Sequence, residues 1–564
     1  MKALSAAVGR FYNPNTLRFV FYAVWLLVAL IQAAGTGLFD DEAYYWVYSR
    51  FLDWGYFDHP PMIAVLIRLG TAILPGELGL RFFIVLMGTA TIGLVEYLTQ
   101  PKDIRLFFAI ILNMAVLQIG GMLAVPDIPL LFFTVLFFIC YQRFEAKNDF
   151  TSALALALVI ALLLYSKYHG ILIIFFTILS NPVILTRWKS LLIIAVSVGL
   201  FMPHVIWQIL HGLPSVNYHL FERLSPPYKI LFTADYVLAQ LLIAGPLVGW
   251  LIIWAALKNK GTNKTEKAMH WSLVGTYLLF FLSSFRSRTE ANWTIPLMAP
   301  LIVLSYRHLS QNMNKAKWIY RLLPYSIAIV LFLRIYMILD IKPFKFIPKD
   351  EFHQNNAWAA AIKKKANGLP VVFTNSYQRA SKYWFYAGDT SFSLNTYRYR
   401  RNNYNFWPME EQLQGRRAMV FESMGNSSLK DSVQTPKMQL VSATTGVFVS
   451  FGAVDLVGEN LQVDDQGSVN VSLEPVYGNR QISERAMAQK PALFLIIYRS
   501  GKQEPILVST GRVIGHDSGY RFSFRLKLPP LKEKKYTIRW GLKGSFLEPT
   551  INSRTYSLTL STGK

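Results

Sequence analysis

Residues 40–61 read DDEAYYWVYSRFLDWGYFDHPP and directly follow an apolar segment, 17–38, that is long enough to cross a bilayer. The stretch carries five carboxylates and one histidine, which are Asp40, Asp41, Glu42, Asp53, Asp58 and His59. Carboxylates beside a membrane are costly to hold, so they usually mark a functional site. We therefore expect this stretch to line a cavity at the membrane surface and to act on a substrate delivered by lipid.

The composition of the chain is that of a polytopic membrane protein. Of its 564 residues, 53% are hydrophobic and 15% are aromatic, and the mean hydropathy is positive. The formal net charge of +24 comes from short basic clusters between apolar runs, which indicates membrane orientation and lipid headgroup contact and excludes a nucleic-acid partner. Cys140 is the only cysteine, which excludes an intrachain disulfide and a cysteine-based zinc site.

The apolar segments predict about eleven membrane helices within residues 1–340. They lie at 17–38, 79–99, 104–122, 126–142, 151–165, 168–184, 190–210, 234–257, 268–284, 293–309 and 318–339. A further apolar stretch, 62–74, is too short to span, and we expect it to lie along the interface.

The charges of the loops predict the orientation. With the N-terminus inside, alternate loops carry the basic clusters, namely Lys102 and Arg105, Arg143 and Lys147, Arg187 and Lys189, Lys258 to Lys267, and Arg307 to Arg321. This bias of Lys and Arg agrees with the positive-inside rule. The opposite loops carry most of the acids. An odd number of crossings then places the chain after 340 outside the cytoplasm, which suits a bacterial inner membrane.

The remainder of the chain reads as two extracytoplasmic domains. Residues 341–437 mix helix-like and strand-like runs and predict a small α/β domain. Residues 438–564 alternate with period two between Gly and Pro breaks, which predicts a β-sandwich-like domain.

The first outer loop holds two acidic sites. Asp41 and Glu42 precede a run of aromatics, and Asp58 and His59 precede two prolines. Together they are able to bind a metal or to deprotonate a hydroxyl group. The alternative is an amphipathic helix with solvated acids at its N-terminus, where they favour the helix dipole.

The stretch DEAYYWVYSRFLDWGYFDHPPMIAVLIRLG (41–70) resembles the first outer loop of polyprenyl-phosphate-dependent GT-C membrane glycosyltransferases. That group includes the protein O-mannosyltransferases and the enzymes that add aminoarabinose to lipid A. The resemblance extends over about 15–410 and includes LAVPDIPLLFF (123–133), LLLYSKYHGILI (162–173), MPHVIWQILHGLPSVNYHLFER (202–223), SRTEANWTIPLMAPL (287–301) and YQRASKYWFYAG (377–388).

The resemblance implies roles for the acidic sites. Asp41 matches the catalytic carboxylate, and Glu42 is its neighbour. The lipid A enzymes that this loop resembles carry Glu-Lys at the positions of Asp58 and His59. A histidine therefore replaces a lysine in this sequence. This departure favours a metal-ligand or proton-transfer role for His59.

A lipid-phosphate donor needs cations to hold its phosphate. Lys167, in SKYHG, is the leading candidate, followed by Arg286 and Arg288. The alternative for Lys167 is a lysine that snorkels to the headgroups. His211 and His219 join Asp58 as candidates for a divalent metal site, or else they are polar interface residues.

A basic and aromatic group in the α/β domain, including Tyr377, Arg379 and Arg401, is the candidate acceptor-binding surface. Aromatic rings stack on sugars and arginine binds anionic glycolipids. The alternative is a solvated surface that rests against anionic lipids.

The sequence thus predicts an integral-membrane inverting glycosyltransferase. Its partners are a polyprenyl-phosphate sugar, an envelope acceptor (lipid A, another glycan or protein) and membrane lipids, and we expect a monomer. The cofactor is a divalent metal ion or none. The alternative function is a transporter or flippase for a lipid-linked saccharide, which predicts internal repeats and broken helices in matching positions of two halves.

Overall fold

The computed structural model describes residues 13–218, 228–341, 350–424, 429–452, 454–477, 489–499, 504–514, 521–533, 535–544 and 547–560. The chain divides into two compact units. The helical unit comprises 1–213 and 228–353, and the sheet-rich unit comprises 214–227 and 354–564. We describe each unit by itself.

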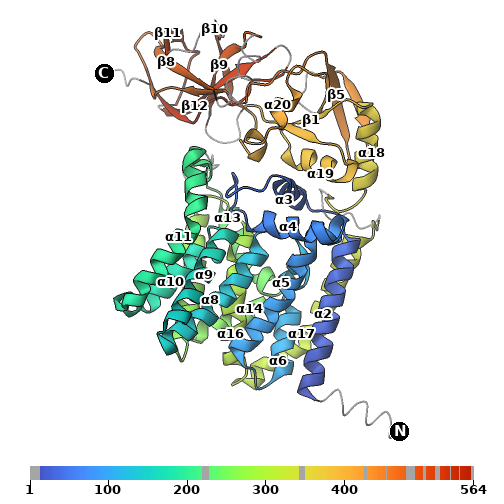
Figure 1. Cartoon of the computed structure of the whole chain (residues 1–564), viewed down its shortest axis with the longest axis vertical. Helices are drawn as coiled ribbons and strands as arrows, with labels where there is room; N and C mark the ends of the chain where they lie inside the picture. Colours follow the sequence, from blue (N-terminus) through green and yellow to red (C-terminus); the bar gives the residue numbers. More distant parts are fainter. Residues whose placement is uncertain are drawn as a thin grey trace. The chain divides into compact units, whose positions relative to one another are not determined.

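The helical unit contains the following helices (Figure 1): α2 (Pro14–Gly35), α3 (Asp40–Arg50), α4 (Met62–Ile73), α5 (Gly76–Thr99), α6 (Ile104–Asn113), α7 (Ala115–Ile119), α8 (Asp127–Lys147), α9 (Phe150–Ser166), α10 (Gly170–Ser180), α11 (Trp188–Leu210), α13 (Ile230–Ala244), α14 (Gly249–Lys258), α15 (Lys264–Ser284), α16 (Met298–Leu309) and α17 (Met313–Ile338). Short 3₁₀ turns are η1 (Gly120–Met122), η2 (Pro182–Thr186) and η4 (Ala291–Leu297).

The protein is a multi-pass membrane protein. In the described part of the chain, five helices, α2, α5, α8, α11 and α17, are long and apolar enough to cross a membrane. The total rises to seven if each of two bent pairs counts as one span. The expected number of about eleven spans is therefore not confirmed. Several expected segments form shorter helices, such as α9 with 17 residues and α10 with 11.

Two expected straight spans are broken, which corrects the sequence prediction. The segment at 104–122 bends by 79° between α6 and α7, and the segment at 234–257 bends by 89° between α13 and α14. Gly245 has φ of 146° and precedes Pro246, so neither residue continues a helix there. At the first break, Asn113 donates from its amide to the carbonyls of Ala109 and Ile319, which satisfies carbonyls that water cannot reach.

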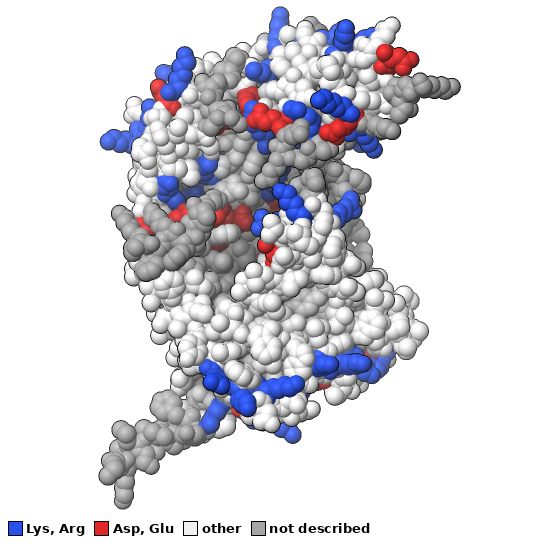
Figure 2. All heavy atoms as spheres, turned by 180° about the vertical axis from the view of Figure 1, so that it is seen from behind, with Lys and Arg blue, Asp and Glu red and all other residues white. Residues whose placement is uncertain are grey.

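The helices pack around one large apolar core. The buried side chains of this core come from α5 to α11, from α13 to α17 and from the 3₁₀ turns η2 and η4. The face of the helical unit seen in Figure 2 shows few charged side chains over most of its height, and Lys and Arg gather in a band at the end where α2 begins. This distribution is expected for helices surrounded by lipid with basic loops at one membrane face.

The first sheet of the sheet-rich unit has the strand order β2-β1-β3-β5-β4. Its strands are β1 (Val371–Thr374), β2 (Ser391–Leu394), β3 (Ala418–Ser423), β4 (Asp431–Gln434) and β5 (Gln439–Thr445), with helices α18 (Asn355–Ala366), α19 (Tyr377–Ala387) and α20 (Met409–Leu413). β1 runs parallel to β2 and β3, whereas β5 runs antiparallel to β3 and β4. The expected boundary at 437/438 falls inside the β4–β5 hairpin, so this sheet continues to Thr445.

Two further sheets follow, with the orders β10-β9-β12-β13-β7 and β11-β8-β6. Their strands are β6 (Val454–Val457), β7 (Leu461–Val463), β8 (Ser468–Tyr477), β9 (Ala492–Tyr498), β10 (Ile506–Val513), β11 (Phe522–Lys527), β12 (Lys535–Lys543) and β13 (Tyr556–Leu560). Both sheets contribute buried side chains to one core around Trp540, as the two-residue alternation of the sequence predicts.

Candidate active site

Helix α3 places the acidic stretch at its N-terminus. Asp40, Asp41 and Glu42 form the first turn, where carboxylates interact favourably with the exposed N–H groups. Glu351 also reaches this turn, and its Oε2 accepts a hydrogen bond of 2.9 Å from the Asp40 N–H. The side chain of Asp41 is half-buried, whereas those of Asp40 and Glu42 are buried. The helix therefore presents Asp41 as the more accessible carboxylate of the turn.

Glu42 forms a fully buried ion pair with Arg81 of α5, with Nη2 and Oε2 2.5 Å apart. The five N–H groups of Arg81 are all used, because they also bond the carbonyls of Ala33, Thr36 and Gly37. The Glu42 carboxylate accepts two further bonds, from the N–H groups of Phe39 and Ala124. Glu42 thus ties α3 to the end of α2, to α5 and to the segment before α8.

Asp58 lies against two tyrosines of α3. The Tyr44 hydroxyl donates to Asp58 Oδ2 at 3.3 Å and the Tyr48 hydroxyl lies 3.5 Å from the same oxygen. Burial raises the pKa of Tyr48 well above its usual value, and the charges of Tyr44 and Asp58 raise it further. Tyr48 therefore stays protonated and acts as a donor to the carboxylate. The ring of His59 packs edge-on to Tyr45 at 5.6 Å.

The other half of the loop is fixed to α11. Trp207 Nε1 donates to Asp53 Oδ2 at 2.7 Å, and His204 Nδ1 lies 2.8 Å from the Trp54 carbonyl. Gly55 lies so close that a Cβ there would come within 2.5 Å of the Trp207 ring, so a larger residue would displace the loop. His204 Nε2 also lies 3.0 Å from the hydroxyl of Tyr168, in the turn after α9.

Lys167 ends α9 and forms a second buried ion pair. Its Nζ lies 2.7 Å from Asp127 Oδ1, and the two side chains are 4% and 5% exposed. Asn292 donates to Asp127 Oδ2 at 3.0 Å and completes the group. A protonated lysine has three N–H donors, so Lys167 is able to hold Asp127 and still donate to a ligand.

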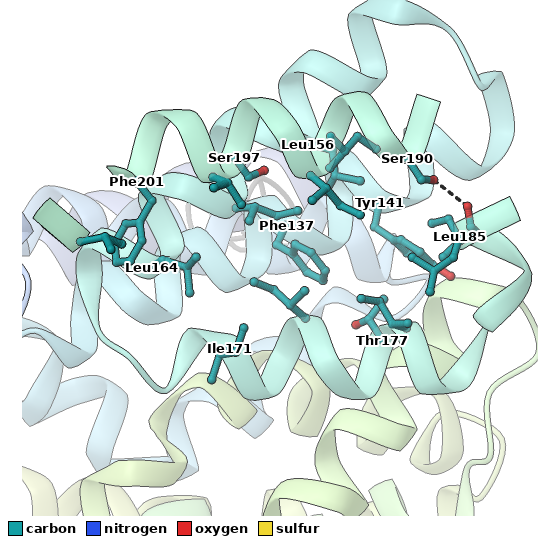
Figure 3. A pocket seen from close by; sticks show the side chains of 18 residues that line it. Phe137, Tyr141, Leu156, Leu164, Ile171, Thr177, Leu185, Ser190, Ser197 and Phe201 are labelled. Atoms are coloured by element: carbon teal, nitrogen blue, oxygen red, sulfur yellow. Dashed lines mark hydrogen bonds between the residues drawn. The ribbon is translucent and has the colours of Figure 1, made fainter. Parts of the chain in front are cut away.

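An apolar cavity of about 350 Å³ runs along α9, α10 and α11 (Figure 3). One end is lined by Leu164, Ile171 and Phe201, and the other by Tyr141, Leu185 and Ser190. Ser190 and Ser197 line it too, but their hydroxyls donate to backbone carbonyls, so the wall has little polar capacity left. Leu164, which lines one end of the cavity, is three residues before Lys167 in the sequence, but Lys167 does not itself line the cavity.

The overall arrangement matches a known structure. The structure of ArnT from Cupriavidus metallidurans in the apo state aligns over 76% of this chain and 98% of its own, with a TM-score of 0.57 and 12% identity. The chain has the GT-C fold. The same enzyme bound to undecaprenyl phosphate aligns over the same shares with a TM-score of 0.56 and 12% identity. The fold that the resemblance of the first outer loop predicted is therefore confirmed.

Sequence comparison points to the same group. The family described as dolichyl-phosphate-mannose-protein mannosyltransferase matches residues 58–207. Lipid A galacturonosyltransferase RgtD of Rhizobium johnstonii is 23% identical over 291 residues, which are 49% of this chain. The match spans 61% of the length of RgtD.

The GT-C fold brings together some of the expected site residues. Asp58 meets the tyrosines of α3, and Lys167 meets Asp127. Arg286 and Arg288 follow α15 and are exposed. His211 stacks on Trp207 with ring centres 4.1 Å apart. His219 lies outside the described residues.

The expected acceptor residues lie in the sheet-rich unit. Tyr377 begins α19 and is buried, and the Arg400 guanidinium lies 5.3 Å from the centre of its ring. Arg379 is half-buried on the same helix. Arg401 forms an ion pair with Asp455, which links the turn after β2 to β6. Arg400 and Arg401 are thus both engaged by side chains of the unit itself.

One metal-competent group occurs among the described residues, and it is not the expected one. It consists of Asp340, Asp350 and His353, whose ligand atoms lie within 4.8 Å of one another. In the described part of the chain, Asp58, His59 and His211 do not form such a group. The sequence analysis missed this cluster, as it missed Arg81, although a lone arginine in an apolar span is itself a signal.

Proposed function

We propose that this protein is a glycosyltransferase that takes a sugar from a polyprenyl-phosphate donor and transfers it to an acceptor of the bacterial envelope. The acceptor class that the relatives favour is lipid A. The observation that carries the proposal is a GT-C fold with a half-buried carboxylate, Asp41, in the first outer loop. Asp41 lies on α3, which the Glu42–Arg81 ion pair holds in place, and the second half of the same loop is fixed to α11.

Asp41 is the proposed general base. Glu42 is poorly suited to this role, because its two oxygens already accept four hydrogen bonds and its charge is neutralised by Arg81. Asp41 would take the proton from the acceptor hydroxyl as the oxygen attacks the anomeric carbon. The bond between that carbon and the phosphate oxygen breaks, and polyprenyl phosphate leaves. General-base catalysis of this kind contributes roughly 10²- to 10⁴-fold in rate.

The proposed donor fits the features near Lys167. Its isoprenoid chain would enter the apolar cavity along α9, α10 and α11, and its phosphate would lie beyond the Leu164 end of that cavity, where it would reach Lys167. Because Asp127 balances the charge of Lys167, this lysine acts mainly as a hydrogen-bond donor. The exposed Arg286 and Arg288 are the proposed source of net positive charge toward the phosphate.

The remaining assignments follow from this scheme. The reaction inverts the anomeric centre and occurs at the outer face of the inner membrane, with the sheet-rich unit also outside. Asp58 and His59 are proposed to assist proton transfer, and Tyr377, Arg379 and Arg401 to form the acceptor-side surface. A divalent ion in the first outer loop is not part of the proposal, because Asp58, His59 and His211 form no metal-competent group among the described residues and His219 lies outside them.

Mass spectrometry of envelope lipids tests the proposal. Cells that express the wild type should carry an acceptor heavier by one sugar residue, and cells that express Asp41→Asn should lack that increment. Glu77→Gln removes the same charge from the first turn of the neighbouring helix α5 and serves as the matched control. A full increment in the Asp41→Asn cells would contradict the proposal.

A further inference from the structure

Three metal-binding side chains meet just after the last long helix, away from the residues assigned to sugar transfer. Asp340 follows α17, and Asp350 and His353 lie further along the chain. Each offers one ligand atom, and these atoms lie within 4.8 Å of one another. His353 Nδ1 is 3.0 Å from both oxygens of Asp350. Two carboxylates and an imidazole at this spacing form a donor set for a divalent ion.

His353 is the buried member of the cluster, with a side chain that is 6% exposed. Its Nδ1 faces the Asp350 carboxylate at 3.0 Å, so this nitrogen is the ligand atom that the ring offers. A buried imidazole held against two half-buried carboxylates is a set of ligands that a divalent ion would use with little rearrangement.

We infer that Asp340, Asp350 and His353 bind a divalent transition-metal ion, with Zn²⁺ as the preferred species. Imidazole nitrogen favours zinc over the hard ions Mg²⁺ and Ca²⁺, and three protein ligands leave room for water. The inferred site uses none of Asp58, His59, His211 or His219. It is therefore distinct from the metal option considered for the first outer loop.

The position of the site suggests what the ion does. Asp350 Oδ1 accepts the N–H groups of Phe352 and His353, which holds the segment in a turn. Glu351 in that turn accepts the Asp40 N–H at the start of α3, and Phe352 stacks on Phe39 with ring centres 6.3 Å apart. An ion that joins Asp340 to this turn would stiffen the support of the helix that carries Asp41. This consequence rests on the proposed function, whereas metal binding itself does not.

Metal analysis of the purified full-length protein tests the inference. After treatment with a chelator and addition of Zn²⁺, the wild type should retain one equivalent, and its Tm should rise. His353→Gln and the nearly isosteric Asp340→Asn should each weaken zinc binding at least about tenfold and abolish the rise in Tm. Two variants are used because His353 is buried and its replacement alone could impair folding.

The controls separate this site from other sites and from transfer activity. His308→Gln, at the end of α16, and the pair Asp58→Asn/His59→Gln should bind zinc like the wild type. Asp41→Asn should also bind zinc normally, even though it is expected to lose transfer. Unchanged zinc content in both cluster variants would overturn the inference, as would metal loss in the Asp58/His59 variant alone. Occupancy by Mn²⁺ but not by Zn²⁺ would overturn the choice of metal.

Discussion

The two most buried ion pairs of the helical unit differ from the ion pairs of the sheet-rich unit in their exposure to solvent. In the helical unit, the ion pairs Glu42–Arg81 and Lys167–Asp127 have side chains that are at most 5% exposed. In the sheet-rich unit, the pair Lys363–Asp389 is about half exposed, with values of 52% and 50%. An exposed pair contributes little stability, whereas breaking a buried pair leaves an unpaired charge in a dry environment.

The buried pairs lie where the molecule needs a fixed geometry. The two buried pairs join elements that are far apart in the sequence. These elements carry the proposed base, Asp41, and Lys167, the residue proposed to donate hydrogen bonds to the phosphate. Burial of a charge pair is weak evidence for stability, because apolar replacements are often equally stable. We therefore interpret these pairs as positioning devices for the site. The predictions below test that interpretation.

The largest effect is expected when the Glu42–Arg81 pair is broken. Glu42→Gln or Arg81→Met should destabilise the protein by about 3–5 kcal/mol, because one buried charge loses its partner. Thermal unfolding in detergent measures this as a fall in Tm. Lys363→Gln, which breaks an exposed pair in the sheet-rich unit, is the control and should leave Tm unchanged.

A double variant sharpens this test. Replacing Glu42 and Arg81 together by apolar residues should recover much of the lost Tm, because no unpaired charge remains. Sugar transfer should nevertheless stay low, because α3 is no longer tied to α5. Recovery of both Tm and transfer in the double variant would show that the pair has no positioning role.

The next largest effect is expected at Lys167. Lys167→Met leaves the buried Asp127 without its lysine and should therefore lower the Tm. In the protein that remains folded, it should raise the KM for the lipid donor by about 10- to 100-fold, equivalent to about 1.4–2.7 kcal/mol of lost binding. The matched control is Lys264→Met, because Lys264 also lies 2.7 Å from a carboxylate, on Glu145, but is 55% exposed. Equal kinetics of the two variants would exclude Lys167 from the donor site.

A moderate effect is expected when the cavity is filled. Leu164→Trp adds volume at the end near Lys167 and should raise the KM for a long-chain donor about tenfold. A donor with a very short isoprenoid chain should be affected less. Leu158→Trp, on the same helix but exposed and outside the cavity lining, serves as the control. Equal sensitivity of the long and short donors would place the chain elsewhere.

The smallest effect concerns the buried acid of the sheet-rich unit, Glu410. Burial raises its pKa, although hydrogen bonds from Ser450 and Gly452 oppose the shift. A raised pKa in the folded state means that the protonated form is favoured, so stability falls as pH rises from the unfolded pKa through the folded one. Glu410→Gln should remove this trend, seen as a smaller change in Tm between about pH 5 and about pH 8. An identical pH dependence in both proteins would contradict the prediction.

Part of the fold and site could be predicted from local sequence signals. The run at 40–61 identified the acidic helix, because a group of charged residues next to an apolar span can be recognised from neighbouring residues alone. The period-two alternation after 438 predicted the strands for the same reason. The apolar runs marked the helices. They did not reveal the bends at Met114 and Gly245, because the hydropathy of a segment does not report a change in the direction of its helix axis.

The pairing of charges could not be predicted in this way. Glu42 and Arg81 are 39 residues apart, and Lys167 and Asp127 are 40 apart, so only the packed helices bring them together. The role of Glu42 shows the consequence. Its position next to Asp41 suggested a second catalytic acid, whereas its contacts with Arg81 and two backbone N–H groups indicate a structural anchor.

Donor turnover by purified protein tests the central claim most directly. The release of polyprenyl phosphate from a polyprenyl-phosphate sugar is measured for the wild type, Asp41→Asn and Glu77→Gln. The three proteins are compared once they are shown to have the same Tm. The account predicts that Asp41→Asn loses about 10²-fold or more in kcat, while Glu77→Gln turns over like the wild type. Wild-type kcat in Asp41→Asn would contradict the account.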